Sequence, residues 1–147
     1  MSTEQSLAVR KCAVIALDVG SKRIGVALSP FGTGLAIPLE PIVRTNLRND
    51  LAAVLALLEA HDSATLVVGD PVTLAGSRGI ASAGIDAFVA KLGRLWAGEI
   101  RRVDERLTTA QSNKVLIGAD VSRARRREVV DGMAAALILE SFLGRSA

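Results

Sequence analysis

The sequence of 147 residues contains little aromatic, cysteine or histidine chemistry. It has three phenylalanines, one tryptophan and no tyrosine, which disfavours a binding surface on which unpaired bases stack. Its one cysteine, Cys12, cannot form an internal disulfide. Its one histidine, His61, is too little for a histidine-based metal site or a Ser-His-Asp triad. Catalysis by this chain would therefore depend on carboxylates.

Long apolar runs are also absent. The longest charge-free stretches, such as 51–58, are far shorter than the roughly 18 residues of a membrane-spanning helix. The apolar run after Lys11 stops at Asp18, before it reaches the length of a signal-peptide core. Half of all residues are nevertheless hydrophobic. We therefore expect a cytoplasmic protein without membrane contact, folded as a single domain over 1–147 after a short disordered lead at 1–9.

The net charge of +3 conceals an uneven distribution. Between 101 and 127 the chain has eight basic residues against three acidic ones, a local charge of +5. Arginine supplies 14 of the 18 cations, and its planar guanidinium suits phosphate. This distribution favours a polyanionic partner, although basic loops in solvent are common.

Apolar periodicity and turn residues predict a βββαβαβ order followed by two helices. Pro38 and Pro41 favour an edge position for the third strand. We expect a mixed α/β sheet covered by helices. The predicted strands are 12–17, 24–28, 35–43, 66–68 and 100–103; the predicted helices are 49–58, 80–95, 108–117 and 128–143, with a basic loop at 119–127.

Acidic residues occur at three positions where burial or a strand end is expected. Asp18 ends an apolar strand, Asp104 and Glu105 follow another, and Asp131 lies in an apolar helix on the face opposite Glu140. Each has an ordinary explanation as well: an Asx turn for Asp18, N-terminal helix charge for Asp104 and Glu105, and an N-cap for Asp131.

Three carboxylates from separate elements would suit a divalent-metal site, because hard oxygen ligands favour Mg²⁺ or Mn²⁺. Two ions at such a site could generate hydroxide and stabilise the leaving oxygen in phosphodiester cleavage. The spacing alone does not distinguish Glu105 from Asp104.

Four ordered blocks of sequence resemble the motifs of the YqgF (RuvX) family. They are the run 16–29 (ALDVGSKRIGVALS), the run 67–71 (VVGDP) with Gly76 and Ser77, the run 104–109 (DERLTT), and the run 131–135 (DGMAA) with Ile138, Leu139 and Glu140. The resemblance extends from Cys12 to Leu143 and implies an RNase H-like fold: a mixed five-stranded sheet with three antiparallel N-terminal strands and helices on both faces.

The resemblance also implies a metal-dependent nuclease, either the enzyme that matures the 5′ end of pre-16S rRNA or a Holliday junction resolvase. The motif positions give Asp18, Glu105 and Asp131 as catalytic and metal-binding residues for Mg²⁺ or Mn²⁺, with two ions expected. The second block (67–71 with Gly76 and Ser77) departs from the family pattern, since Asp70 replaces a large apolar residue and 73–76 (TLAG) replaces Asn-Met-Asp-Gly. We interpret Asp70 as a surface charge in a loop and exclude it from the catalytic set.

Basic residues beside these acids are candidates for binding phosphate in structured RNA or branched DNA, by a monomer or a homodimer. They are Lys22, Arg23, Arg106, Arg123, Arg125, Arg126 and Arg127. Two other functions are compatible with the same residues. One is a nucleic-acid-binding module without catalysis, and the other is nucleotide binding, since Asp18-Val19-Gly20 and Gly25-Val26-Ala27 also resemble the first phosphate loop of actin-like ATPases.

Overall fold

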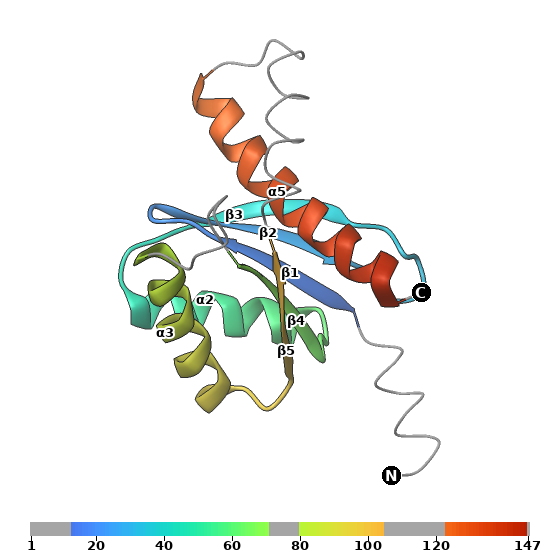
Figure 1. Ribbon diagram of the computed structural model, residues 1–147, viewed down its shortest axis with the longest axis horizontal. Coiled ribbons are helices and arrows are strands. Elements are labelled where there is room, and N and C mark those ends of the chain that lie inside the picture. Colours follow the sequence, from blue (N-terminus) through green and yellow to red (C-terminus); the bar gives the residue numbers. More distant parts are fainter. Residues whose placement is uncertain (1–12, 71–79, 105–122, 147) are drawn as a thin grey trace.

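The fold is built around one mixed sheet (Figure 1). The computed structural model describes residues 13–70, 80–104 and 123–146, with the backbone alone at 80–82, 123–131 and 145–146. Within these ranges, no helix has the length and apolar character needed to cross a membrane.

Five strands form the sheet in the order β3-β2-β1-β4-β5. The first three pair antiparallel, and β4 and β5 continue the sheet parallel to β1. The mixed sheet and the edge position of the proline-containing strand are thus confirmed. The strands are β1 (Val14–Val19), β2 (Arg23–Ser29), β3 (Ile37–Val43), β4 (Thr65–Asp70) and β5 (Glu99–Asp104).

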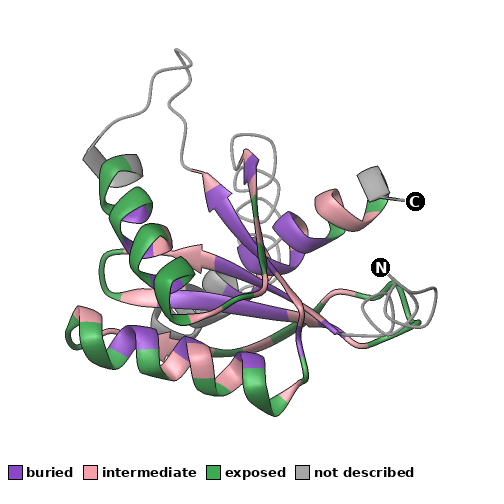
Figure 2. Ribbon diagram, turned by 90° about the horizontal axis from the view of Figure 1, so that it is seen from below, coloured by how far each residue is buried: buried purple, intermediate pink, exposed green. Residues whose placement is uncertain are grey.

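Helices cover both faces of the sheet (Figure 1). Helices α2 (Leu47–Ala60) and α3 (Ile80–Leu95) lie on one face, and α5 (Arg123–Ser146) lies on the other. Buried residues concentrate on the sheet and on the sides of the helices that face it (Figure 2). Both of the predicted layers are confirmed.

The two faces have cores of different size. The core below α2 and α3 is made of large side chains such as Ile15, Leu17 and Phe88. On the opposite face, α5 packs through Ala135 against Ala16 and Ala27, together with a few valines and larger aliphatic residues. Since small side chains allow close approach, the backbone of α5 can lie near the strands. At Gly132, an added Cβ would lie 3.2 Å from the Pro38 Cβ.

The predicted start of the last helix was wrong. Helix α5 begins at Arg123 rather than at 128, so the C-terminal part of the predicted basic loop is helical. The same boundary excludes the N-cap explanation for Asp131, because the helix starts eight residues before it. This extension has no signature in the sequence, since the four arginines among residues 123–127 are equally compatible with a solvated loop. The predicted helix 108–117 lies outside the described residues.

The small-residue packing of α5 leads to a stability prediction. Replacement of Ala135 by Leu should lower the free energy of unfolding by about 1–3 kcal/mol, because the added atoms have no free volume between α5 and the sheet. Urea denaturation would measure this change. Ala90→Leu, on an exposed position of α3, is the matched control and should change stability by less than about 0.5 kcal/mol. Equal effects of the two substitutions would contradict the packing described here.

Candidate metal-binding edge of the sheet

Asp18 lies within β1, one residue before the strand ends, and its side chain is half-buried. Its ladder partner on β2 is Gly25, so it is a strand residue and not the Asx-turn residue of the alternative explanation. Because side chains alternate across a strand, Asp18 shares the face of Ala16, which packs in the α5 cluster.

Glycines flank Asp18 in both neighbouring strands. Gly25 lies directly opposite on β2. On β4, Gly69 follows Val68, the parallel partner of Leu17, and both glycines are buried. The residues beside Asp18 in the two neighbouring strands therefore carry no side chain. Carboxylate oxygen is a preferred ligand of hard cations, so the chemistry of Asp18 fits such an ion.

The turn that follows Asp18 is held by main-chain hydrogen bonds. The Gly20 amide donates to the Arg23 carbonyl at 2.9 Å, and the Arg44 amide donates to the Lys22 carbonyl at 2.9 Å. A Cβ built on Gly20 would lie 2.8 Å from the Arg23 carbonyl oxygen. Glycine is therefore required at this position for steric reasons.

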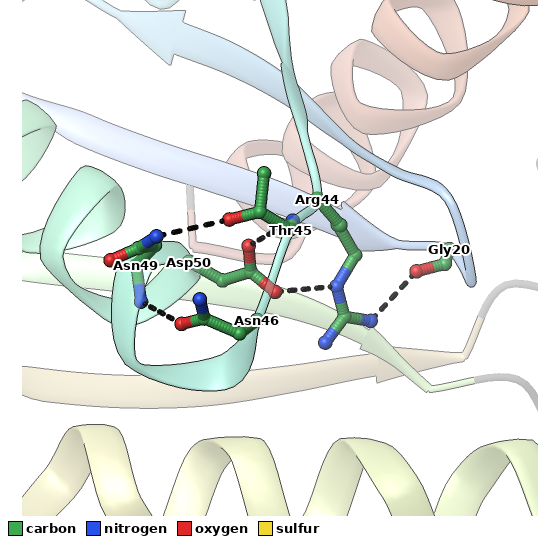
Figure 3. Close-up of polar contacts among 6 residues, drawn as sticks. All are labelled: Gly20, Arg44, Thr45, Asn46, Asn49 and Asp50. Carbon is green, nitrogen blue, oxygen red and sulfur yellow. Dashed lines mark hydrogen bonds and ion pairs between the residues drawn. The ribbon is translucent and has the colours of Figure 1, made fainter.

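The Arg44 side chain ties this turn to helix α2 (Figure 3). Its Nη1 donates to the Gly20 carbonyl at 2.8 Å, and its Nε donates to Asp50 Oδ2 at 2.9 Å. The other carboxylate oxygen of Asp50 accepts the Thr45 amide at 3.1 Å. The guanidinium carbon also lies 5.9 Å from the ring centroid of Phe88 on α3, within the range of a cation–π interaction.

Asp50 is 2 % exposed and Arg44 is 25 % exposed, so the acid is almost fully removed from water. Sequence reasoning missed this pair, although a signal was present. Asp50 falls on the apolar side of α2 with Leu47, Leu51 and Val54, which is the same argument that identified Asp131. A buried carboxylate in that position requires a cation or hydrogen-bond donors.

The carboxylates at the ends of β4 and β5 belong to the other face. Asp70 and Asp104 are ladder partners, and they lie on the same face of the sheet as Val68 and Ile100, which pack toward α2 and α3. Asp70 Oδ1 accepts Nη2 of Arg102 at 3.2 Å, and Nη1 of Arg102 donates to Asp86 on α3 at 3.0 Å. Asp70 is thus a strand residue in an ion pair and not, as predicted, a loop charge.

The remaining predicted site residues are only partly described. Lys22 is exposed in the β1–β2 turn, and Arg23 is half-buried at the start of β2. Glu105 and Arg106 lie outside the described residues. The backbone of α5 includes Asp131, Arg123, Arg125, Arg126 and Arg127, whose side chains are not described. Among the described side chains, no group of three or more potential metal ligands gathers.

The direction of α5 is nevertheless clear. Val14, at the start of β1, packs in the same cluster as Phe142 and Leu143, near the end of α5. The helix thus runs antiparallel to β1, and its N-terminal part lies toward the end of the sheet that carries Asp18 (Figure 1).

Comparison with known proteins identifies the family. The family model described as "RuvX: Holliday junction resolvase" matches residues 12–145. The chain belongs to the RuvX family. A relative from Ruegeria pomeroyi is 43% identical over 90% of this chain and 86% of its own length, and one from Moorella thermoacetica is 44% identical over 90% and 94%; both are named "Putative pre-16S rRNA nuclease". RuvX is a nuclease family, and nucleases are hydrolases.

Solved structures of low sequence identity share the fold. RuvC of T. thermophilus in complex with a Holliday junction substrate aligns with a TM-score of 0.59 at 15% identity, over 90% of this chain and 96% of that one. The yeast mitochondrial Holliday junction resolvase Ydc2 aligns with a TM-score of 0.53 at 11% identity, over 97% and 85%. The RuvX chain thus has the RNase H-like fold that its motifs imply.

The turn beside Asp18 provides a steric prediction. Gly20→Ala should lower the free energy of unfolding by about 1–3 kcal/mol, since its Cβ would displace the Arg23 carbonyl. Gly84→Ala is the control: it lies within α3 with no atom near its added Cβ, so it should raise stability by about 0.5–1 kcal/mol. Thermal unfolding of both variants measures the difference. A neutral Gly20→Ala would contradict the turn geometry.

Removal of the Asp50 carboxylate provides a second prediction. Asp50→Ala should destabilise the fold by about 2–3 kcal/mol, because the Arg44 Nε and the Thr45 amide lose their acceptor. Chemical denaturation measures the loss, and Glu40→Ala, an exposed acid on β3, should change stability by less than about 0.5 kcal/mol. If Asp50→Ala were as stable as Glu40→Ala, Asp50 would not hold the turn in place.

Proposed function

We propose that this RuvX chain is a divalent-metal-dependent nuclease that cleaves phosphodiester bonds to form the 5′ end of 16S rRNA from its precursor. The observation that carries the proposal is Asp18 at the carboxyl end of the central strand, between two glycines, in a chain whose relatives bear the name of a pre-16S rRNA nuclease. The cytoplasmic location expected from the sequence is part of this proposal.

Asp18, Glu105 and Asp131 would hold the metal, with Mg²⁺ or Mn²⁺ as the ions and two ions as the expected number. Asp18 is supported by its position, since its carboxylate faces α5, the helix that contains Asp131. Glu105 directly follows β5, and Val103 two residues earlier packs in the α5 cluster. When bound, such ions supply a hydroxide nucleophile near neutral pH and stabilise the leaving oxygen.

Basic residues would hold the phosphates of the substrate. Lys22 is exposed in the turn that follows Asp18, so its ammonium group is free to pair with a phosphate close to the metal ligands. Arg23, at the start of β2, would bind phosphates of the same polynucleotide strand as Lys22. The remaining basic candidates, proposed from the sequence, are Arg106, Arg123, Arg125, Arg126 and Arg127.

Branched DNA is the alternative substrate. The family is described as a Holliday junction resolvase, and T. thermophilus RuvC, which shares the fold, was solved with a Holliday junction. In either case the carboxylates would act in the same way, and the identity of the polynucleotide would depend on contacts outside the metal site.

The test compares single variants of the three acids on two substrates. Asp18→Asn, Glu105→Gln and Asp131→Asn should each lose about 100-fold or more of the Mn²⁺-dependent cleavage rate, because an amide is a poor substitute for a carboxylate ligand. The substrates are a pre-16S rRNA 5′ fragment and a four-way DNA junction, and their relative rates decide which one the enzyme prefers.

Asp70→Asn is the matched control, because Asp70 lies on the opposite face and pairs with Arg102. It should retain wild-type cleavage per folded molecule. If the three variants cleaved as fast as wild type, the proposed site would be wrong. If wild type bound both substrates but cleaved neither with Mn²⁺, the chain would be a binding module rather than an enzyme.

A further inference from the structure

A groove runs along helix α2 on the face of the sheet that is opposite to Asp18. Two adjoining hollows share Leu55 of α2 and Leu95 at the end of α3, so together they form one continuous surface. One hollow lies toward the start of α2 and includes Ala52. The other lies toward the end of α2 and includes Trp96, which directly follows α3. Leu95 is 61% exposed. The groove is thus an apolar surface open to solvent.

The two ends of this groove carry opposite charge. Arg48 and Lys91 line the end near the start of α2, whereas Glu59 and Asp62 line the end beyond its last turn. All four are exposed, and none forms an ion pair in the described part of the chain. The groove therefore presents an apolar centre between an unpaired basic end and an unpaired acidic end.

The charged groups lie on either side of the middle of α2. Arg48 lies in its first turn, Glu59 lies in its last turn, and Asp62 follows shortly after its end at Ala60. Arg48, Ala52, Leu55 and Glu59 recur at helical spacing and so share one side of α2. From Arg48 to Glu59 the helix rises about 16 Å. A half-turn about an axis perpendicular to the groove and midway between Ala52 and Leu55 therefore exchanges the positions of the basic and acidic ends of α2.

We propose that this groove is the interface of a homodimer. Two copies would pack their α2 helices antiparallel about a two-fold axis near Leu55, with Arg48 and Lys91 of each copy against the acidic end of the other. A two-fold axis makes every contact twice, so a surface that is complementary to itself fits a second copy of the same chain. The small Ala52 and the exposed Leu95 would form the apolar centre, and the charges would set the register.

This arrangement leaves the proposed catalytic face free. Asp18 faces α5, whereas the groove lies on the side of α2 and α3. The dimer would thus present two separate metal-binding edges. The inference depends on the shape and charge of the groove and does not require the proposed nuclease activity.

Sedimentation equilibrium of the full chain tests the interface by charge reversal. The variants Arg48→Glu/Lys91→Glu and Glu59→Lys/Asp62→Lys should each self-associate at least about tenfold more weakly than wild type, since each repels its own copy. An equimolar mixture of the two variants should form heterodimers, because the four acidic residues of one variant then face the four basic residues of the other. Higher salt should weaken the wild-type dimer.

Glu40→Lys/Glu140→Lys is the matched control, with the same change in net charge as Glu59→Lys/Asp62→Lys on residues exposed away from the groove. It should dimerise like wild type. Circular dichroism of every variant checks folding. A wild-type chain that stays monomeric up to about 1 mM would overturn the proposal and leave the groove to another partner. The proposal would also be overturned if the equimolar mixture of the two charge-reversal variants failed to associate although both variants were folded.

Discussion

The bond from Arg44 to Asp50 connects the two halves of this fold. Arg44 comes from the end of the antiparallel part of the sheet, and Asp50 comes from the first turn of the helix that begins the βα part. Through the Gly20 carbonyl, the same guanidinium reaches the turn after Asp18. Because Asp50 is almost fully buried, loss of this contact would leave a carboxylate charge without compensation in the interior, which is strongly destabilising. The position of the proposed metal ligand thus depends on a helix on the opposite face.

The two faces of the sheet differ in the size of their side chains, and this difference determines what each face contributes to the structure. Large aliphatic residues fill the space below α2 and α3 and provide most of the hydrophobic stabilisation. Alanines and glycines line much of the α5 face, where close approach of a helix and open space around a carboxylate are needed. Asp70 illustrates the separation: it lies near Asp18 in the sheet but on the other face, where it neutralises Arg102.

Much of this was predictable from the sequence because it depends on local pattern. Alternating and continuous apolar runs identified the five strands, the prolines identified the edge, and the family motifs identified the fold. The buried Asp50 was predictable by the same pattern as Asp131, because both acids fall on the apolar face of a helix, but its partner Arg44 lies outside any such pattern. The start of α5 was missed for a different reason: residues 123–127 contain four arginines and one alanine, so they carry no apolar periodicity that would separate a helix from a loop.

The central position of β1 has a mechanical consequence. This strand is hydrogen-bonded to β2 on one side and to β4 on the other, so its main chain cannot shift without breaking bonds in both ladders. Asp18 is paired with Gly25 of β2 and directly follows Leu17, which is paired on both sides. When a cation or a substrate approaches, the adjustment in shape has to come from the approaching group or from the helical layer above, while the strand serves as the fixed reference for both.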